Sequence, residues 1–137
     1  MQLDPSAFVA DSDLIEVLGN RAEPVACQQD LVLFHQGDAP TGLYLLYKGE
    51  ATIAMAAETG GSLVASKAGS SSILGLPGLI SNSPYTLTVT AMAGANVGFV
   101  SRDRFTELMQ SDPQLLLKIL RVLAAEVRTA RQAFNQM

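Results

Sequence analysis

Short apolar runs that end at glycine turns fill the middle of this chain and restrict what it can fold into. Within residues 24–100, Leu31–Phe34 and Leu43–Tyr47 are followed by turns that contain Gly37 and Gly49. Glycine adopts the positive φ angles that tight turns need. Many short strands at regular spacing favour a β-sandwich or barrel over an alternating α/β fold.

Three further segments of the same region are predicted to be strands or hairpins. Ala51–Ala57 and Ser62–Lys67 flank Thr59-Gly60-Gly61, a combination typical of a β-hairpin. Thr86–Thr90 alternates polar and apolar residues, as a strand with one buried face does. Asn96–Val100 then supplies the last strand of the predicted β domain.

Helices are predicted on both sides of the strands. Ser12–Leu18 is amphipathic, with Ser12 as its cap and Gly19 at its end. Ser101 is placed to cap a helix over residues 102–110. Asp112 is predicted to cap a long helix over residues 113–133, with Pro113 in its first turn.

The last helix carries two apolar faces. One has the 4, 3, 4, 3, 4 spacing of a coiled-coil seam and consists of Leu116, Leu120, Leu123, Val127, Ala130 and Phe134. The other consists of Leu115, Ile119, Val122 and Ala125. We expect the first face to form a homodimer interface and the second to pack on the strands. A monomer in which both faces are packed is the alternative.

Several weak motifs occur here in an order that is specific as a set. They are Leu33-Phe34-x-x-Gly37-Asp38, Leu43-Tyr44-x-x-x-x-Gly49, and Arg102-x-x-Phe105 before the long helix. With the segment 75–91, the chain resembles the cyclic nucleotide-binding-like domain of the Crp/Fnr family over nearly its whole length. The resemblance implies a mainly β fold, a double-stranded β-helix (jelly roll) with flanking short helices and a long C-terminal dimerisation helix.

The expected organisation is a single domain over residues 1–137. It comprises an N-terminal helical segment (1–22), a β-roll (23–100) that includes the cassette (75–91), and C-terminal helices (101–137). In transcriptional regulators of the family a helix-turn-helix domain follows the long helix. Here the sequence ends at Met137, so we expect no DNA binding by these residues alone, whether they form a free-standing sensor or part of a longer regulator.

Residues 75–91 resemble the phosphate-binding cassette of the family with its two charged residues replaced. Leu76 stands where the family has the glutamate that binds the ribose, and Tyr85 where it has the arginine that pairs with the phosphate. Gly75 and Thr86 match the pattern. The candidate ligand-binding residues are Gly75, Leu76, Pro77, Gly78, Ser83, Tyr85 and Thr86. Because loss of a buried charge partner costs about 3–5 kcal/mol, cAMP and cGMP are not expected to bind tightly, and no cofactor is predicted.

The expected function is a small-molecule-sensing regulatory module that signals through the C-terminal dimer helix. Leu76 and Tyr85 would give the cavity an apolar wall and a phenol, which suits an apolar or mildly polar ligand. A cavity filled by these two side chains is the alternative, and it corresponds to a ligand-free dimeric interaction or scaffold module. The identity of a ligand or protein partner stays open.

The inventory of reactive side chains argues against an enzyme. The chain has one histidine, His35, and one cysteine, Cys27. A single histidine cannot supply a cupin-type metal site, and no catalytic triad is apparent. We expect an exposed His35, a buried inert Cys27 inside a strand, and no metal site. The net charge of −4 does not favour electrostatic binding of nucleic acid. No apolar stretch approaches a membrane span and no signal peptide is recognised, so a cytoplasmic protein is expected.

Overall fold

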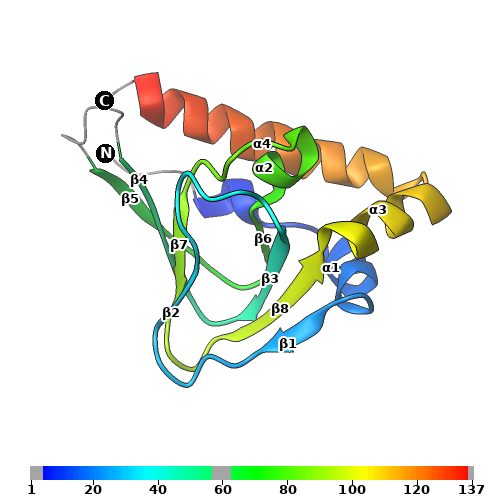
Figure 1. Cartoon of the computed structure of the whole chain (residues 1–137), viewed down its shortest axis with the longest axis horizontal. Helices are drawn as coiled ribbons and strands as arrows, with labels where there is room; N and C mark the ends of the chain where they lie inside the picture. The colour runs from blue at the N-terminus through cyan, green and yellow to red at the C-terminus, as the bar shows by residue number, and fades with distance from the viewer. Residues whose placement is uncertain (1–4, 57–62, 136–137) are drawn as a thin grey trace.

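Two four-stranded antiparallel sheets form the body of the computed structural model, which describes residues 5–56 and 63–135 (Figure 1). The strands are β1 (Glu23–Val25), β2 (Leu31–Phe34), β3 (Gly42–Lys48), β4 (Ala51–Ala56), β5 (Leu63–Ala68), β6 (Ser72–Leu74), β7 (Thr88–Ala91) and β8 (Asn96–Ser101). One sheet has the order β1-β8-β3-β6 and the other β2-β7-β4-β5. This arrangement confirms the predicted mainly β jelly roll.

The predicted alternation of polar and apolar residues is present in β7, although this strand spans Thr88–Ala91 rather than the predicted Thr86–Thr90. In β7, Val89 and Ala91 are buried while Thr88 and Thr90 are partly exposed. β4 pairs with β5 from Ala51↔Ala68 to Ala56↔Leu63, as the predicted hairpin requires. The expected turn at residues 59–61 lies outside the described residues.

The helices are η1 (Pro5–Phe8), α1 (Ser12–Gly19), α2 (Leu76–Ser81), α3 (Arg102–Ser111) and α4 (Leu115–Asn135). The cap at Ser101 is confirmed, because its hydroxyl accepts a hydrogen bond from the backbone N–H of Arg104. The cap predicted at Ser12 is wrong. Asp11 takes the extended backbone conformation of an N-cap, and Ser12 is the first helical residue.

The predicted start of the long helix is also wrong. Asp112 ends α3, and its N–H donates to the carbonyl of Leu108. A residue before proline disfavours the helical conformation, so Asp112 cannot extend α3 into the next helix. A turn follows, with hydrogen bonds of 3.1 Å from Leu115 N to Asp112 O and from Leu116 N to Pro113 O, and α4 begins at Leu115.

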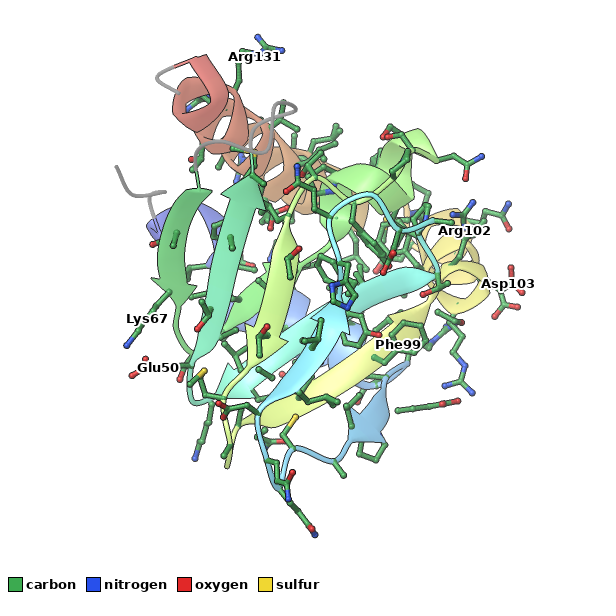
Figure 2. All side chains as sticks on the ribbon, turned by 60° about the vertical axis from the view of Figure 1, so that its left-hand side comes forward. Glu50, Lys67, Phe99, Arg102, Asp103 and Arg131 are labelled. Carbon is green, nitrogen blue, oxygen red and sulfur yellow. The ribbon has the colours of Figure 1, made fainter. Side chains whose placement is uncertain are left out.

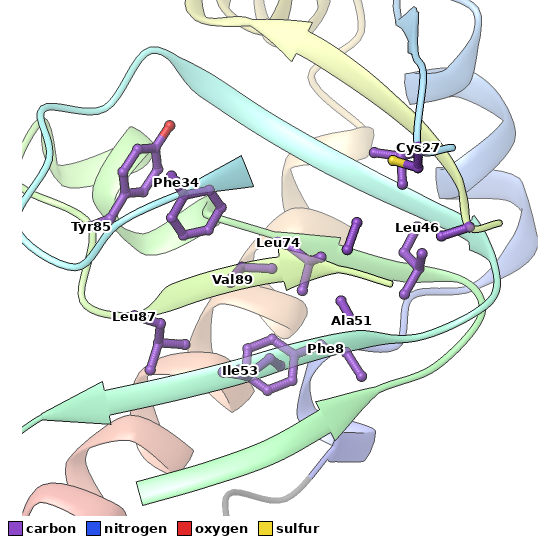
Figure 3. Close-up of a cluster of buried hydrophobic side chains, with 14 of the residues drawn as sticks. Phe8, Cys27, Phe34, Leu46, Ala51, Ile53, Leu74, Tyr85, Leu87 and Val89 are labelled. Atoms are coloured by element: carbon purple, nitrogen blue, oxygen red, sulfur yellow. The ribbon is translucent and has the colours of Figure 1, made fainter. Parts of the chain in front are cut away.

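The buried apolar side chains form two clusters. The first fills the roll between the sheets and includes Phe34, Ile53 and Val89 (Figure 3). The second packs helices against the β1-β8-β3-β6 sheet and includes Leu14, Leu43, Leu76, Phe105 and Ile119. Helix α4 runs across one end of the roll, where it contacts α2 and η1 (Figure 1).

Candidate ligand-binding site

The cassette helix α2 begins at a sharp change of chain direction. Gly75 has φ +90°, and a Cβ atom at this position would lie 3.0 Å from the Tyr85 ring and 3.3 Å from the Phe34 ring. Glycine is therefore required both for the left-handed conformation and for the close approach of the two rings. Pro77 follows in the first turn of α2, where its missing N–H has no helical partner to lose.

The end of α2 is held by an arginine from the Arg-x-x-Phe motif. Asn82 has a left-handed conformation (φ 52°) at the C-cap of α2. Arg102, at the start of α3 (Figure 2), donates to the side-chain oxygen of Asn82 and to the carbonyl of Pro40, the latter at 2.6 Å. This arginine fixes α2 against the loop before β3. It does not line the cavity beside the cassette.

Tyr85 is a structural brace as well as a wall of the site. Its ring stacks on Phe34 with centroids 4.0 Å apart (Figure 3). Its hydroxyl donates to the carbonyl of Gly42 at 2.7 Å and accepts from the N–H groups of Thr41 and Gly42 at 3.1 and 3.3 Å. The phenol that the sequence offered as a ligand contact therefore already has protein partners.

A small cavity of about 10 Å³ lies beside the cassette, which is room for roughly one water molecule. Its walls are Phe8, Phe34, Gly75, Pro77, Gly78, Tyr85, Thr86, Leu87 and Glu126. Five of the seven sequence-predicted ligand residues therefore meet there. Leu76 does not, because it is fully buried in the second apolar cluster. Ser83 also lies elsewhere and shares a hydrogen bond with the Ser81 hydroxyl.

Glu126 is the one functional candidate that the sequence analysis missed. It lies on α4 and is only 2% exposed. Within residues 5–56 and 63–135, no group forms a hydrogen bond to either of its carboxylate oxygens. Burial raises the pKa of this carboxyl well above its usual range.

A sequence signal for Glu126 exists. The buried face of α4 consists of Leu115, Ile119, Val122, Glu126 and Thr129, so the 4, 3, 4, 3 spacing continues through a carboxylate and a hydroxyl. The face predicted from the sequence ends at Ala125, one residue before Glu126. A charged residue in an otherwise apolar helix face is the observation that would have identified it.

The predicted dimer face of α4 is exposed where its side chains are described. Leu116, Leu120 and Val127 are 44%, 46% and 37% exposed. Leu123 is half-buried and packs against the second apolar cluster. The side chains of Ala130 and Phe134 lie outside those that the structure describes. Dimerisation through this face stays a prediction.

His35 and Cys27 offer no site of their own. His35 is exposed, as expected. Cys27 is buried, and burial raises the pKa of its thiol. Its predicted place inside a strand is wrong, because β1 ends at Val25. In the described part of the chain, no group of three or more histidine, cysteine, aspartate or glutamate residues is arranged to hold a metal ion. None of the described helices has the length and apolarity needed to cross a bilayer.

A family model for the cyclic nucleotide-binding domain matches residues 24–112. A search of curated proteins finds no match. The described fold is similar to the catabolite activator protein of Thermus thermophilus, with a TM-score of 0.76, 16% identity, and coverage of 97% of this chain and 62% of that one.

Two further solved structures have the same fold. The c-di-GMP responsive global regulator CLP of Xanthomonas campestris gives a TM-score of 0.72 at 18% identity, with 92% of this chain and 62% of the regulator covered. A cyclic nucleotide-binding domain from Methylobacillus flagellatus gives 0.71 at 22% identity, with 93% and 72% covered. This chain thus spans 62% of the length of each of the two named regulators.

Proposed function

The chain belongs to the cyclic nucleotide-binding domain family, and we propose that it is a small-molecule-sensing regulatory module of the Crp/Fnr type. We also propose that it does not bind cAMP or cGMP tightly. The observation that carries the proposal is the cassette cavity. None of its wall residues is an arginine or lysine, and its one acidic side chain is Glu126.

A cyclic phosphate would find an unfavourable environment in this cavity. Pairing of a buried anion with arginine is strong because the hydrogen bonds are charge-assisted and bidentate. Removal of one partner of a buried ion pair costs about 3–5 kcal/mol, which is a factor of hundreds or more in affinity. Tyr85 stands in the place of that arginine, and its hydroxyl is bonded to Gly42.

Helix α4 connects the cavity to the exposed apolar face. Glu126 on its inner side lines the cavity, and Leu120 and Val127 on its outer side are exposed. If α4 can adopt two positions, a ligand with a higher affinity for one of them would favour that position. It would therefore change the surface offered to a second copy of the chain. We include in the proposal a homodimer through this face, and a non-catalytic role in the cytoplasm.

A second candidate function is favoured by the size of the cavity. A volume of about 10 Å³ leaves no space for a nucleotide without movement of α4 or the cassette. A dimeric interaction or scaffold module with a silent cavity fits this volume. The two functions differ in whether binding of a small molecule changes the position of α4.

Isothermal titration calorimetry of the purified chain with cAMP and cGMP tests the proposal. We expect no binding heat up to millimolar nucleotide, because no cation from the cavity wall meets the phosphate. Heat changes that fit a dissociation constant in the micromolar range or below would contradict the proposal and return the chain to the ordinary cyclic nucleotide sensors.

A further inference from the structure

The buried carboxyl of Glu126 needs an explanation that the packing of the fold does not give. A carboxyl group that loses its contacts with water and gains no hydrogen bond destabilises a protein. An alanine or leucine at this position would continue the apolar face of α4 formed by Ile119 and Val122. Instead, Glu126 borders a cavity into which an additional group of about the size of one water molecule fits.

The other cavity walls supply no cation. Residues from η1, β2, α2 and the loop before β7 form these walls, and the only other titratable side chain among them is Tyr85. The Tyr85 hydroxyl already donates to Gly42. On α4 the basic residue nearest to Glu126 in sequence is Arg128, which is exposed and does not line this cavity. Lys118 and Arg121 line a different cavity between α4 and the N-terminal segment. There Lys118 lies 3.4 Å from Asp11.

We propose that this cavity binds the ammonium end of a small primary amine. Glu126 would then give the cassette a preference for a cation, whereas the cassette of the family pattern holds a phosphate. An ammonium group has about the volume of a water molecule and offers three N–H donors. The exposed Thr86 forms part of the cavity wall, and the remainder of the ligand leaves the cavity on that side. The inference rests on the proposed sensing function and names the ligand chemistry for the same site.

Binding of the amine is linked to release of a proton. In the empty cavity burial raises the pKa of the Glu126 carboxyl well above its usual range, which favours its protonated form. The arriving ammonium keeps its own three protons, the carboxyl gives its proton to solvent, and an ion pair forms. One proton is therefore released for each amine bound. While the empty carboxyl is protonated, the affinity rises by about tenfold for each pH unit.

Chemical-shift titrations of the ¹⁵N-labelled full chain test this proposal. The probes are ethylammonium chloride, ethanol, and tetramethylammonium chloride, which has the charge but no N–H, all at constant ionic strength. We expect only ethylammonium to give saturable shifts at the amides of Gly75, Gly78 and Glu126. Its apparent dissociation constant falls by up to about tenfold from pH 7 to pH 8. In Glu126→Gln, which keeps the side-chain shape without the charge, binding weakens by roughly tenfold or more.

Three outcomes would overturn the proposal in distinguishable ways. If ethylammonium binds equally well to the wild type and to Glu126→Gln, the carboxyl does not recognise it. If ethanol saturates the same amides in both proteins, the site accepts small molecules and the sensing function stands, but the charge preference is wrong. If no probe shifts these amides, the amine proposal fails and the silent scaffold gains support.

Discussion

Tyr85 and Glu126 determine the chemistry of the cassette at the level of single residues. Tyr85 closes one side of the cavity and ties the cassette loop to the start of β3 through Gly42. Glu126 approaches from α4 and places the only carboxylate in the cavity wall. One residue thus removes the cation of the family pattern and the other adds an acid, so the site changes in both charge and volume.

The bracing role of Tyr85 predicts a loss of stability in Tyr85→Phe. The ring stacking on Phe34 is kept, but the buried Gly42 carbonyl loses its donor at 2.7 Å. We expect the free energy of unfolding to fall by about 1–3 kcal/mol, measured by urea denaturation.

Tyr47→Phe is the matched control for Tyr85→Phe. Tyr47 is half-buried, and no hydrogen bond of its hydroxyl is found among the described residues. Its substitution should change the free energy of unfolding by no more than about 0.5 kcal/mol. Equal effects of the two substitutions would show that the Tyr85 hydroxyl does not brace the cassette.

Sequence reasoning identified the replaced cassette residues but not what became of their side chains. Leu76 and Tyr85 were both expected to face the ligand. Leu76 instead packs with Leu43 in the second cluster, because the first residue of α2 points to the helix side of the sheet. The direction of a side chain at such a turn depends on backbone angles, here set by Gly75 at φ +90°. A residue pattern does not contain these angles.

Helix α4 is the element on which the proposed signalling depends. Its inner face packs through Leu115 and Ile119, whereas Leu116 and Leu120 are 44% and 46% exposed. Exposed apolar residues that share one helix face mark an interaction surface. The 4, 3 spacing predicted one exposed and one buried apolar face, since it depends only on helix geometry. It placed Leu123 on the exposed face, although this residue packs against its own domain, and it did not include Glu126 in the buried face. The start of the helix was missed because Asp112 was assigned to the wrong helix end.

We predict that Leu116→Asp with Leu120→Asp converts a dimer into a folded monomer. Two carboxylates in a coiled-coil seam lose apolar contact and repel their copies in the partner. These two positions are preferable to Leu123, which packs against its own domain. Multi-angle light scattering measures the mass, and circular dichroism checks the fold.

Val32→Asp is the control for the seam variant. Val32 is 41% exposed, a similar value, but it lies on β2 rather than α4. It should leave the measured mass unchanged. A double variant that is still dimeric, or a wild type that is monomeric at the same concentration, would show that this face of α4 is not the interface.

The whole molecule combines an intact family fold with an altered cavity. The strand pattern predicted only a β-sandwich or barrel, and the resemblance of the ordered motifs to the Crp/Fnr family implied the jelly roll. The volume of the cavity was not predictable. It results from the stacking of Phe34 on Tyr85 and from the position of α4, which bring together residues from five separate parts of the chain.

The central claim is that the cassette cavity has lost its cation and gained the buried carboxyl of Glu126 from α4, and the pH dependence of folding stability tests it most directly. The raised pKa of Glu126 in the folded state means that the unfolded state loses its proton first as pH rises above about 4.5. The free energy of unfolding therefore falls with rising pH, by up to about 1.4 kcal/mol per unit, until the folded-state pKa is passed.

Urea denaturation of wild type and Glu126→Gln at pH 5 and pH 8 measures this contribution, because all other titrating groups are shared. We predict that the wild type loses at least about 1 kcal/mol more than Glu126→Gln between these pH values. Identical losses in the two proteins would mean that Glu126 titrates like an ordinary exposed carboxyl, and the charge-reversed cassette would have to be abandoned.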